Sequence, residues 1–458
     1  MRRMKKVIAL LLLVVFAANI TGCRIALYMR EVEEKAWVEE GSLVAEDALG
    51  SGIGSEGANA MEEPELSGTL KLQVFTNESA NHADAWTNVV TAFEEATGIS
   101  VTLIMGSQVN TQYSAAWLAG ETPADIIWIN GNGIADEEMK TSGTFYDLTE
   151  VLTEGNIYGT DAKISDKLNM GVVETYNGGM YYAPLLNSVQ GMWYDTELVK
   201  KVPTNFEEFK AVSAELTGKG IAGMTYPGMY SEYSIWALIM PAVAAYGEEF
   251  FNKVASGDPG SFLDERFVSV MKRYEEYSKA GYIMKGSTAA DHTSSQLSWL
   301  NREAGFITNG LWLEVEMQDY IPDDFHMAFC ASPLITSDQT PTLIKTANNI
   351  AVAAKTKNLE NALAFVRYIY RDDVQREFMS KYGYLSALKS LNYEDAELSQ
   401  VAEGTLNYVN SGNVNVLSKS VNMHALLNNT FKQVVNDIAS GEMTAEQACQ
   451  ALSDDAKR

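Results

Sequence analysis

The feature that most constrains the fold is a regular alternation of strand and helix patterns that begins at Thr69. Short β-branched and apolar runs alternate with segments whose apolar residues share one helical face. The strands are predicted at residues 69–76, 100–105 and 124–129, and the helices at residues 84–97 and 111–119. Strand, helix and strand in succession are typical of a parallel sheet with right-handed crossovers, so the first lobe is predicted to be α/β.

A chain of 458 residues is longer than most single domains, so two lobes are expected. A second α/β unit is predicted to start near Tyr181. One helix, over residues 205–217, has Thr204 and Glu207 at the spacing of a capping box. Further helices are predicted at residues 264–280, 358–370 and 425–439, and short strands at residues 304–308, 326–329 and 349–353. The sequence therefore predicts two α/β lobes.

Charge and cysteine content exclude several classes of protein. The formal net charge of −26 makes nucleic acid an unsuitable partner, since phosphate binding needs clustered Lys and Arg. After Cys23 only Cys330 and Cys449 remain, far apart and without zinc-ligand spacing, so either two buried thiols or one disulfide fits them. We expect no metal ion and no cofactor.

The N-terminus carries an export pattern. Residues 1–22 combine a basic end with an apolar run over residues 7–18, which is too short to span a bilayer, so they predict a signal peptide. Cys23 follows Thr21-Gly22 as in the lipobox of bacterial lipoproteins, which predicts lipidation and a membrane anchor. The alternative is an ordinary exported protein with an incidental cysteine. Residues 23–66 are acidic and rich in Gly, Ser and Ala, which predicts a flexible linker.

Aromatic and amide residues gather at predicted strand ends and in polar segments. Ligands of open parallel sheets bind at the carboxyl ends of strands, where Asn77, Glu78, Trp128 and Asn130 are placed. The other candidates are Tyr194, Tyr230, Tyr233, Trp236 and Trp312. A sugar lays its apolar faces on rings and pairs its hydroxyls with amides and carboxylates, so these residues favour a carbohydrate site. Trp86 and Trp117 lie on apolar helix faces and are predicted to be core.

No pattern predicts catalysis. The four histidines form no close metal-binding pair, and the sequence has no GxSxG elbow, phosphate-binding loop or EF-hand loop. Sixty acidic residues leave a glycosidase-like pair of carboxylates open, but nothing selects two of them. We therefore expect a binding protein rather than an enzyme.

From Leu70 onward the chain resembles the bacterial extracellular solute-binding proteins of sugar ABC transporters, the group that includes maltose-binding protein. The matching segments, in order, are KLQVFTNES, AFEEATGISV, PADIIWIN, YYAPLLNSVQGMWYDTEL, WLNREAGFITNGLWL, TANNIAVAAKTKNLENALAFVRYIY and ASGEMTAEQACQAL. The resemblance implies a two-lobed periplasmic-binding-protein-like fold of type II, with each lobe a mainly parallel sheet flanked by helices and with hinge strands between the lobes. Lobe 1 is expected at residues 67–183 and 335–372, and lobe 2 at residues 184–334 and 373–458.

The resemblance also implies a function and a site. Asn77, Glu78, Trp128 and Asn130 match ligand contacts of the family, Tyr194, Trp236 and Trp312 match its aromatic positions, and Asn348 stands where the family often has glycine; Tyr230 and Tyr233 come from the residue pattern. The expected protein is a monomeric, lipid-anchored receptor on the extracellular face of the membrane that delivers a carbohydrate, expected to be an oligosaccharide, to an ABC permease. A surface glycoside hydrolase, a receptor for a non-sugar solute such as glycerol phosphate, and a receptor that feeds a membrane sensor remain as alternatives.

Overall fold

The structure is a computed structural model that describes residues 61, 63–76, 80–129, 139, 141–389, 391, 393, 398–418 and 425–458. All of these residues belong to one compact unit, Gly54–Arg458. The predicted signal peptide, Cys23 and most of the predicted linker lie outside the described residues. Of the helices in the described part of the chain, none has both the length and the apolar character needed to cross a bilayer.

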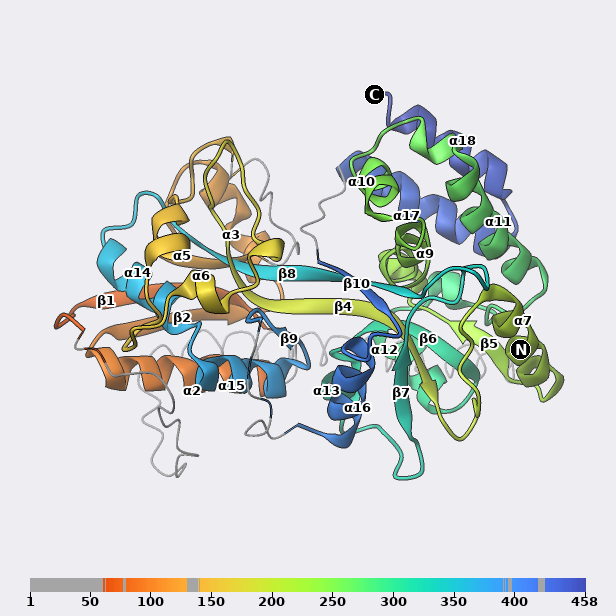
Figure 1. The fold of residues 1–458 in the computed structure, drawn as a ribbon, viewed down its shortest axis with the longest axis horizontal. Helices are drawn as coiled ribbons and strands as arrows, with labels where there is room; N and C mark the ends of the chain where they lie inside the picture. Colours follow the sequence, from red (N-terminus) through yellow and green to blue (C-terminus); the bar gives the residue numbers. More distant parts are fainter. Residues whose placement is uncertain are drawn as a thin grey trace, which may run out of the picture. The chain divides into compact units, whose positions relative to one another are not determined.

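Two long strands, β4 (Ala183–Asp195) and β8 (Thr342–Val352), connect the two halves of the fold (Figure 1). The strands pair in the order β2-β1-β3-β8-β4-β6-β5, with β10 beside β8 and with β7 and β9 beside β4. β1 is parallel to β2 and β3, and β5 is parallel to β6, whereas β4 and β8 run antiparallel to each other. The strands are β1 (Thr69–Phe75), β2 (Ser100–Gly106), β3 (Ile126–Ile129), β4 (Ala183–Asp195), β5 (Ala222–Thr225), β6 (Ala304–Gly310), β7 (Met327–Cys330), β8 (Thr342–Val352), β9 (Leu385–Ser386) and β10 (Asn415–Ser418). The predicted α/β class is confirmed.

Lobe 1 is the half built on β1, β2 and β3. Its helices are α2 (Ala80–Thr97), α3 (Val109–Leu118), α5 (Thr149–Glu154), α6 (Ile164–Lys167), α14 (Leu359–Tyr368) and α15 (Asp372–Tyr382), with a 3₁₀ turn at Met170–Val172. α2 and α15 pack side by side on the sheet (Figure 1). The α2 stripe Trp86, Val89, Val90 and Phe93 is buried, so the helical periodicity of the sequence identified the side of α2 that faces the core.

Lobe 2 is the half built on β5, β6 and β7. Its helices are α7 (Phe206–Gly218), α8 (Glu232–Ser234), a π-helix (Ile235–Ile239), α9 (Met240–Ala244), α10 (Glu248–Ala255), α11 (Glu265–Lys279), α12 (His292–Leu300), α13 (Leu313–Met317), α16 (Gln400–Val409), α17 (Ala425–Ser440) and α18 (Ala445–Asp455), with 3₁₀ turns at Gly228–Tyr230, Ser261–Leu263 and Ser287–Ala289. Most of their apolar faces form the lobe 2 core, which includes α7, α11, α17 and α18 and buries Cys330 and Cys449 as free thiols. Trp299 of α12 and Leu313 of α13 pack in a second cluster.

The capping box predicted for α7 is displaced by one residue. Asn205, not Thr204, is the N-cap, and its side chain accepts a hydrogen bond from the backbone N–H of Glu208 at 3.1 Å. Glu208 reaches back and accepts from the backbone N–H of Thr204 at 3.0 Å. An Asn caps a helix as well as a Thr does. The cap is therefore formed by Asn205 and Glu208, which have the same spacing as Thr204 and Glu207.

The predicted lobe boundaries need two corrections. Residues 373–391 were assigned to lobe 2, but Phe378 and Tyr382 of α15 and Leu388 pack in the same core as β1 and α2 of lobe 1. Residues from 335 were assigned to lobe 1, but Ile344 packs in the lobe 2 core. The reason is that β8 crosses between the lobes along its length, so a boundary falls inside a strand and not in a loop.

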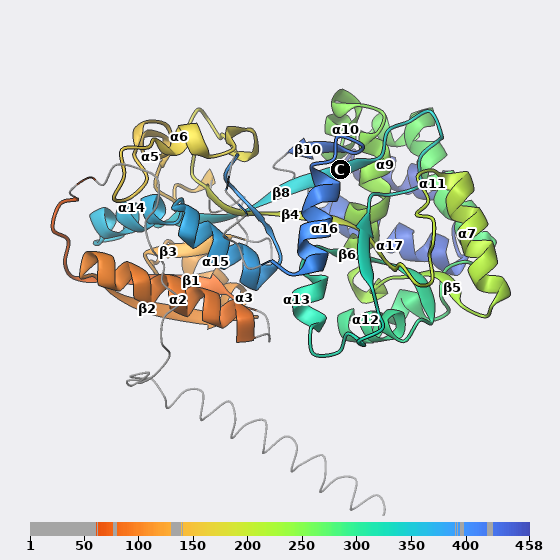
Figure 2. The same ribbon diagram turned by 60° about the horizontal axis from the view of Figure 1, so that its bottom comes forward.

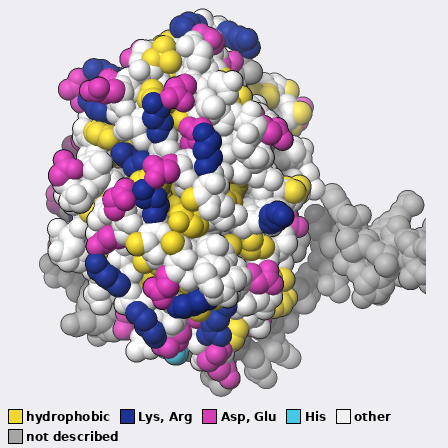
Figure 3. Space-filling view, turned by 90° about the vertical axis from the view of Figure 1, so that its right-hand side faces the viewer, with side chains coloured by type: hydrophobic (Ala, Val, Ile, Leu, Met, Phe, Trp, Pro, Cys, Tyr) yellow, Lys and Arg dark blue, Asp and Glu magenta, His cyan; other side chains and the backbone are white. Residues whose placement is uncertain are grey.

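The face over α7, α11 and α18 carries mixed charge. Lys and Arg side chains alternate with Asp and Glu over it (Figure 3). Lys210 of α7 pairs with Glu276 of α11 at 2.6 Å, and Lys272 of α11 pairs with Glu446 of α18 at 2.7 Å. Exposed pairs of this kind contribute little to stability, about 0–1 kcal/mol each, so the buried apolar faces hold these helices together.

Candidate ligand-binding site

A series of aromatic rings runs from lobe 2 to lobe 1. Tyr230 stacks on His292 with ring centroids 4.0 Å apart, and Tyr233 lies edge-on to His292 at 4.9 Å and to Trp312 at 6.0 Å. Trp312 then meets Tyr384, which follows α15 of lobe 1, at 5.3 Å with 72° between the ring planes. Trp312 and Tyr384 are therefore rings at which the two lobes meet.

The position of Trp312 depends on a glycine two residues earlier. Trp312 is the N-cap residue of α13 and lies two residues after the end of β6, and its ring folds back over Gly310. A Cβ placed on Gly310 would lie 2.0 Å from the Trp312 ring, so only glycine leaves room for it. The Gly310 carbonyl also accepts a hydrogen bond from the Trp193 indole N–H at 2.9 Å. The Asn309-Gly310-Leu311-Trp312 sequence thus sets this ring at the end of a strand.

Polar side chains line one face of the hinge strands β4 and β8. Leu186 of β4 pairs with Asn348 of β8, and Ser188 pairs with Thr346; since alternate residues of a strand share a face, Gln190 lies on the same face. Ser188 and Thr346 share a hydrogen bond of 3.0 Å between their hydroxyls. Within the described residues, Gln190 Oε1 and Asn348 Nδ2 are buried without a hydrogen-bond partner. Buried polar groups are normally paired, so this donor and this acceptor are suited to a polar ligand.

Tyr233 lies next to a carboxylate in lobe 2. Burial raises the pKa of its phenol well above the usual value, and the neighbouring Glu316 adds to the rise, so Tyr233 stays neutral. Gln296 of α12 donates to Glu316 at 3.0 Å. The segment continues into the π-helix Ile235–Ile239, a rare form that often marks functional sites. Tyr233 and Glu316 together offer a ring and hydrogen-bonding groups.

In lobe 1 the series of rings continues at the carboxyl end of β1. Tyr382 lies 5.8 Å from Tyr384, stacks on His82 at 3.7 Å, and accepts a hydrogen bond from the Trp86 indole N–H at 2.8 Å. The Tyr382 hydroxyl donates to the backbone carbonyl of Phe75 at 3.3 Å. These contacts brace the strand end after which the sequence places Asn77 and Glu78. Asn77, Glu78 and Asn130 themselves lie outside the described residues.

Trp128 lies in the core of lobe 1, so its burial does not support the expected ligand contact, which stays a prediction. Only 1% of its side chain is exposed, and its ring packs against Phe75, Trp86 and Tyr382. The reason is that β3 is a central strand with all four residues buried, so neither of its faces is free. Trp86 and Trp117 are buried in the core as predicted.

The other predicted rings divide into two groups. Tyr230, Tyr233 and Trp312 belong to the series of rings described above. Tyr194 and Trp236 instead pack against the lobe 2 core. Tyr194 lies five residues after Val189, where the pairing of β4 with β8 ends, and its ring is tilted against Phe306 at 6.0 Å. Burial raises the pKa of its phenol to about 12. A role of Tyr194 as a ligand contact is therefore not supported.

Three residues at the site were not predicted from the sequence. Glu316 follows Trp312 by four residues, so a helical reading of residues 312–317 would have placed the two on one side. Tyr384 belongs to the Tyr382-Gly383-Tyr384 sequence, where Gly383 ends α15 with a positive φ of 67°. His292 begins α12. No local pattern links Tyr384 or His292 to Trp312, because their contacts join distant parts of the chain.

Acidification is expected to destabilise lobe 1 through His82. Burial lowers the pKa of His82 from 6.5 to about 3. The unfolded chain therefore binds the proton first, and stability that is present above pH 6.5 is lost as the pH falls toward 3. Between pH 6.5 and 5 the protein should lose about 2 kcal/mol more than a His82→Phe variant, which keeps a ring on Tyr382. Urea unfolding at both pH values measures this, and equal losses in the two proteins would contradict a neutral buried imidazole.

Comparison with known proteins settles the family. The family model described as bacterial extracellular solute-binding protein matches residues 79–376, which is more than half of the chain. The chain belongs to this family. The members of this family bind solutes without catalysing a reaction, so this solute-binding protein is not an enzyme. A search of curated protein sequences found no significant match.

Solved structures share the fold of this solute-binding protein. A chitin oligosaccharide binding protein matches with a TM-score of 0.66 at 17% identity, over 86% of this chain and 99% of the other. Apo RafE from Streptococcus pneumoniae matches with a TM-score of 0.66 at 16% identity, over 86% and 98%. A probable secreted solute-binding lipoprotein from Streptomyces coelicolor gives 0.67 at 17% identity, over 85% and 98%. At these identities the likeness concerns the fold.

Proposed function

We propose that this solute-binding protein captures a carbohydrate between its lobes, and that the ligand is an oligosaccharide. The observation that carries the proposal is the series of rings from Tyr230 to Tyr384, beside hinge amides that have unpaired atoms. Rings cover the apolar faces of pyranoses, and amides serve their hydroxyls. Several rings in sequence fit several sugar units. Neighbours of this fold are described as binding chitin oligosaccharide, raffinose and acarbose, which supports the same class of ligand.

The proposed mechanism is a shift in population between open and closed lobes. Trp312 belongs to lobe 2 and Tyr384 to lobe 1, so a sugar that touches both rings has more contacts when the lobes are close. A ligand shifts such an equilibrium only by its extra affinity for one state. The hinge strands β4 and β8 carry Gln190 and Asn348 at the crossing, where the ligand's hydroxyls would find their partners.

A thermal-shift panel tests the class of ligand. The purified protein is heated with chito-, malto-, xylo- and raffinose-type oligosaccharides, and in parallel with glycerol phosphate. A matching sugar at 100 times its Kd should stabilise the folded protein by about 2.7 kcal/mol. We expect stabilisation by at least one oligosaccharide, with the sugar recovered intact. A response to glycerol phosphate alone would exclude the carbohydrate proposal, and release of shorter sugars would indicate a hydrolase.

We further propose that Cys23 is lipidated and anchors the protein at the extracellular face of the membrane, where it serves an ABC importer. The support is the export pattern of residues 1–22 and the Thr21-Gly22-Cys23 sequence. Several acyl chains on one residue hold a protein stably at a bilayer. The proposed partner is the permease, and a membrane sensor is the alternative partner, which co-purification from membranes distinguishes.

A Cys23→Ala substitution should release the protein from the membrane. The parent is expected in the membrane fraction. The variant is expected either in the soluble fraction or as a precursor that keeps residues 1–22, because the thiol that carries the lipid is gone. Fractionation with immunoblotting measures this, and Cys449→Ala is the control because Cys449 is buried in lobe 2. Membrane retention, at the parental level, of Cys23→Ala chains from which residues 1–22 have been removed would refute the anchor.

A further inference from the structure

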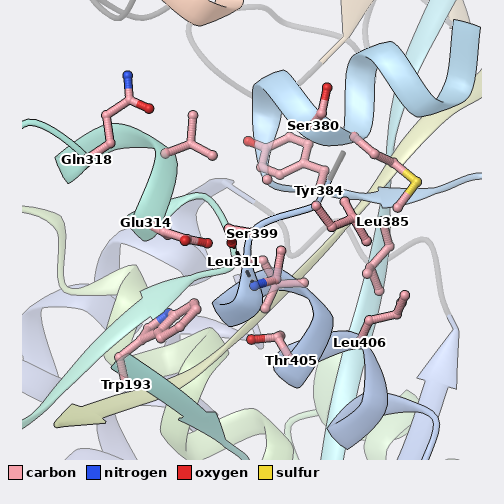
Figure 4. Close-up of a pocket in the computed structure, with 15 residues that line it drawn as sticks. Trp193, Leu311, Glu314, Gln318, Ser380, Tyr384, Leu385, Ser399, Thr405 and Leu406 are labelled. Atoms are coloured by element: carbon pink, nitrogen blue, oxygen red, sulfur yellow. Dashed lines mark hydrogen bonds between the residues drawn. The ribbon is translucent and has the colours of Figure 1, made fainter. Parts of the chain in front are cut away.

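α15 of lobe 1 approaches α13 and α16 of lobe 2 (Figure 2). A cavity of about 190 Å³ lies between these helices (Figure 4). Both lobes contribute to its walls, and β4 and β9 contribute one residue each. Fifteen residues line it, among them Trp193, Glu314, Tyr384, Leu385, Ala402 and Thr405. Most of them are apolar, so the cavity suits the apolar body of a small organic molecule.

This cavity is separate from the face of Trp312 and the hinge amides. On α13, Trp312 and Glu316 are four residues apart and share one side, whereas Leu311, Glu314, Val315 and Gln318 line the cavity from another side. On β4, Trp193 lies three residues after Gln190, and residues an odd number apart point to opposite faces of a strand. Tyr384 lines the cavity and also contacts the ring of Trp312. The cavity therefore adjoins the proposed sugar site without being part of it.

The polar groups of the cavity are suited to a cation. Glu314 is its single carboxylate, and none of the described lining residues is Lys, Arg or His. Burial raises the pKa of Glu314, since the carboxylate is poorly solvated there, and a hydrogen bond with Ser399 opposes that rise. A cation beside Glu314 would restore the interactions that burial removes.

Thr405 provides a second, independent indication of a ligand. Its side chain is only 7% exposed and lines the cavity, and no described residue gives its hydroxyl a hydrogen-bond partner. A threonine in a helix can bond to the carbonyl four residues earlier, but in α16 Thr405 does not. Figure 4 shows Thr405, Trp193 and Glu314 around the same space. A buried unpaired hydroxyl in a cavity wall is a built hydrogen-bonding position.

We propose that this cavity binds a small organic amine in its ammonium form. The ammonium group pairs with Glu314 and donates to the hydroxyl of Thr405, and the apolar part lies against Trp193 and Leu385. The size is adequate, because an apolar cavity of about 150 Å³ holds a benzene ring. Because the walls come from both lobes, an amine that touches α15 and α13 together favours one angle between the lobes.

Isothermal titration calorimetry on the full chain, without sugar, tests the site. Phenethylamine is the probe, and phenylacetate, with the same ring and the opposite charge, is its matched control. We expect phenethylamine to bind and phenylacetate not to bind. Glu314→Gln should weaken amine binding by roughly tenfold or more, and Thr405→Val by about fivefold. Ala402→Trp should abolish binding by filling the cavity.

Glu403→Gln is the matched control variant, because Glu403 is an exposed residue of α16 that does not line the cavity. It removes the same charge and should leave the affinity for phenethylamine unchanged. If Glu314→Gln and Glu403→Gln weakened the binding of phenethylamine equally, the loss would come from the long-range effect of the removed charge, and the site would be overturned. Equal binding of phenylacetate, no binding of phenethylamine at about 10 mM, or unchanged binding to a folded Ala402→Trp variant would each overturn it too. These outcomes are independent of the sugar proposal.

Discussion

Trp312→Ala is expected to weaken sugar binding by at least about 2 kcal/mol, or roughly thirtyfold in Kd. The ring lies between Tyr233 of lobe 2 and Tyr384 of lobe 1, so its removal takes away a surface that the proposed ligand would contact between the lobes. Calorimetry with the sugar that responds in the thermal-shift panel measures the loss. A Trp312→Phe variant keeps a smaller ring and should recover part of the affinity.

Loss of stability must be separated from loss of binding, because only 8% of Trp312 is exposed. Truncation of such a ring leaves a cavity, and Trp→Ala changes in a core cost about 3–5 kcal/mol. Trp299→Ala is a matched control: Trp299 lies in the same lobe, is 1% exposed, and packs on Phe325. We expect both variants to melt earlier and only Trp312→Ala to lose affinity. Equal Kd values for the two folded variants would remove Trp312 from the site.

Local sequence patterns predicted the helices α2, α3, α7, α11, α14 and α17, but they did not predict α10, α12, α15, α16 or α18. The stripe Phe206, Phe209, Val212 and Leu216 predicted the packed face of α7, and Phe206, Phe209 and Leu216 are buried. Apolar periodicity is a short-range signal that needs only the residues of one element. The capping residue of α7 was misplaced by one position because Thr204 and Asn205 are both good caps and the spacing to Glu207 or Glu208 fits either.

The site was harder to predict than the fold because it is built from long-range contacts. Trp312 could be singled out from its place after Asn309-Gly310, since a strand that ends in glycine leaves room for a ring. Tyr384 could not, since its contact with Trp312 depends on α15 packing in lobe 1 beside α2. The sequence analysis assigned residues 373–458 to lobe 2 and predicted no helix at α15. No local pattern therefore placed Tyr384 among the candidate residues.

Trp128→Ala is expected to destabilise the protein by about 3–5 kcal/mol through the loss of a core ring. Trp128 packs against Phe75, Trp86 and Tyr382, with centroid distances from 5.1 to 6.2 Å, so its removal leaves a cavity under the carboxyl end of β1. Urea unfolding followed by tryptophan fluorescence and by circular dichroism measures the change. The Kd for sugar should stay close to that of the parent as long as lobe 1 remains folded.

Trp117→Ala is the control for this prediction, because Trp117 is fully buried in lobe 1 and donates to Gln73 at 2.9 Å. If Trp128 is core, the two variants should lose stability to a similar extent, and a Trp128→Phe variant should recover part of it. If Trp128 instead faces the ligand, Trp128→Ala would melt near the parental temperature and lose sugar affinity. The second result would mean that β3 presents a ring to the space between the lobes, and the ligand site would then extend to the strand end where the sequence first placed it.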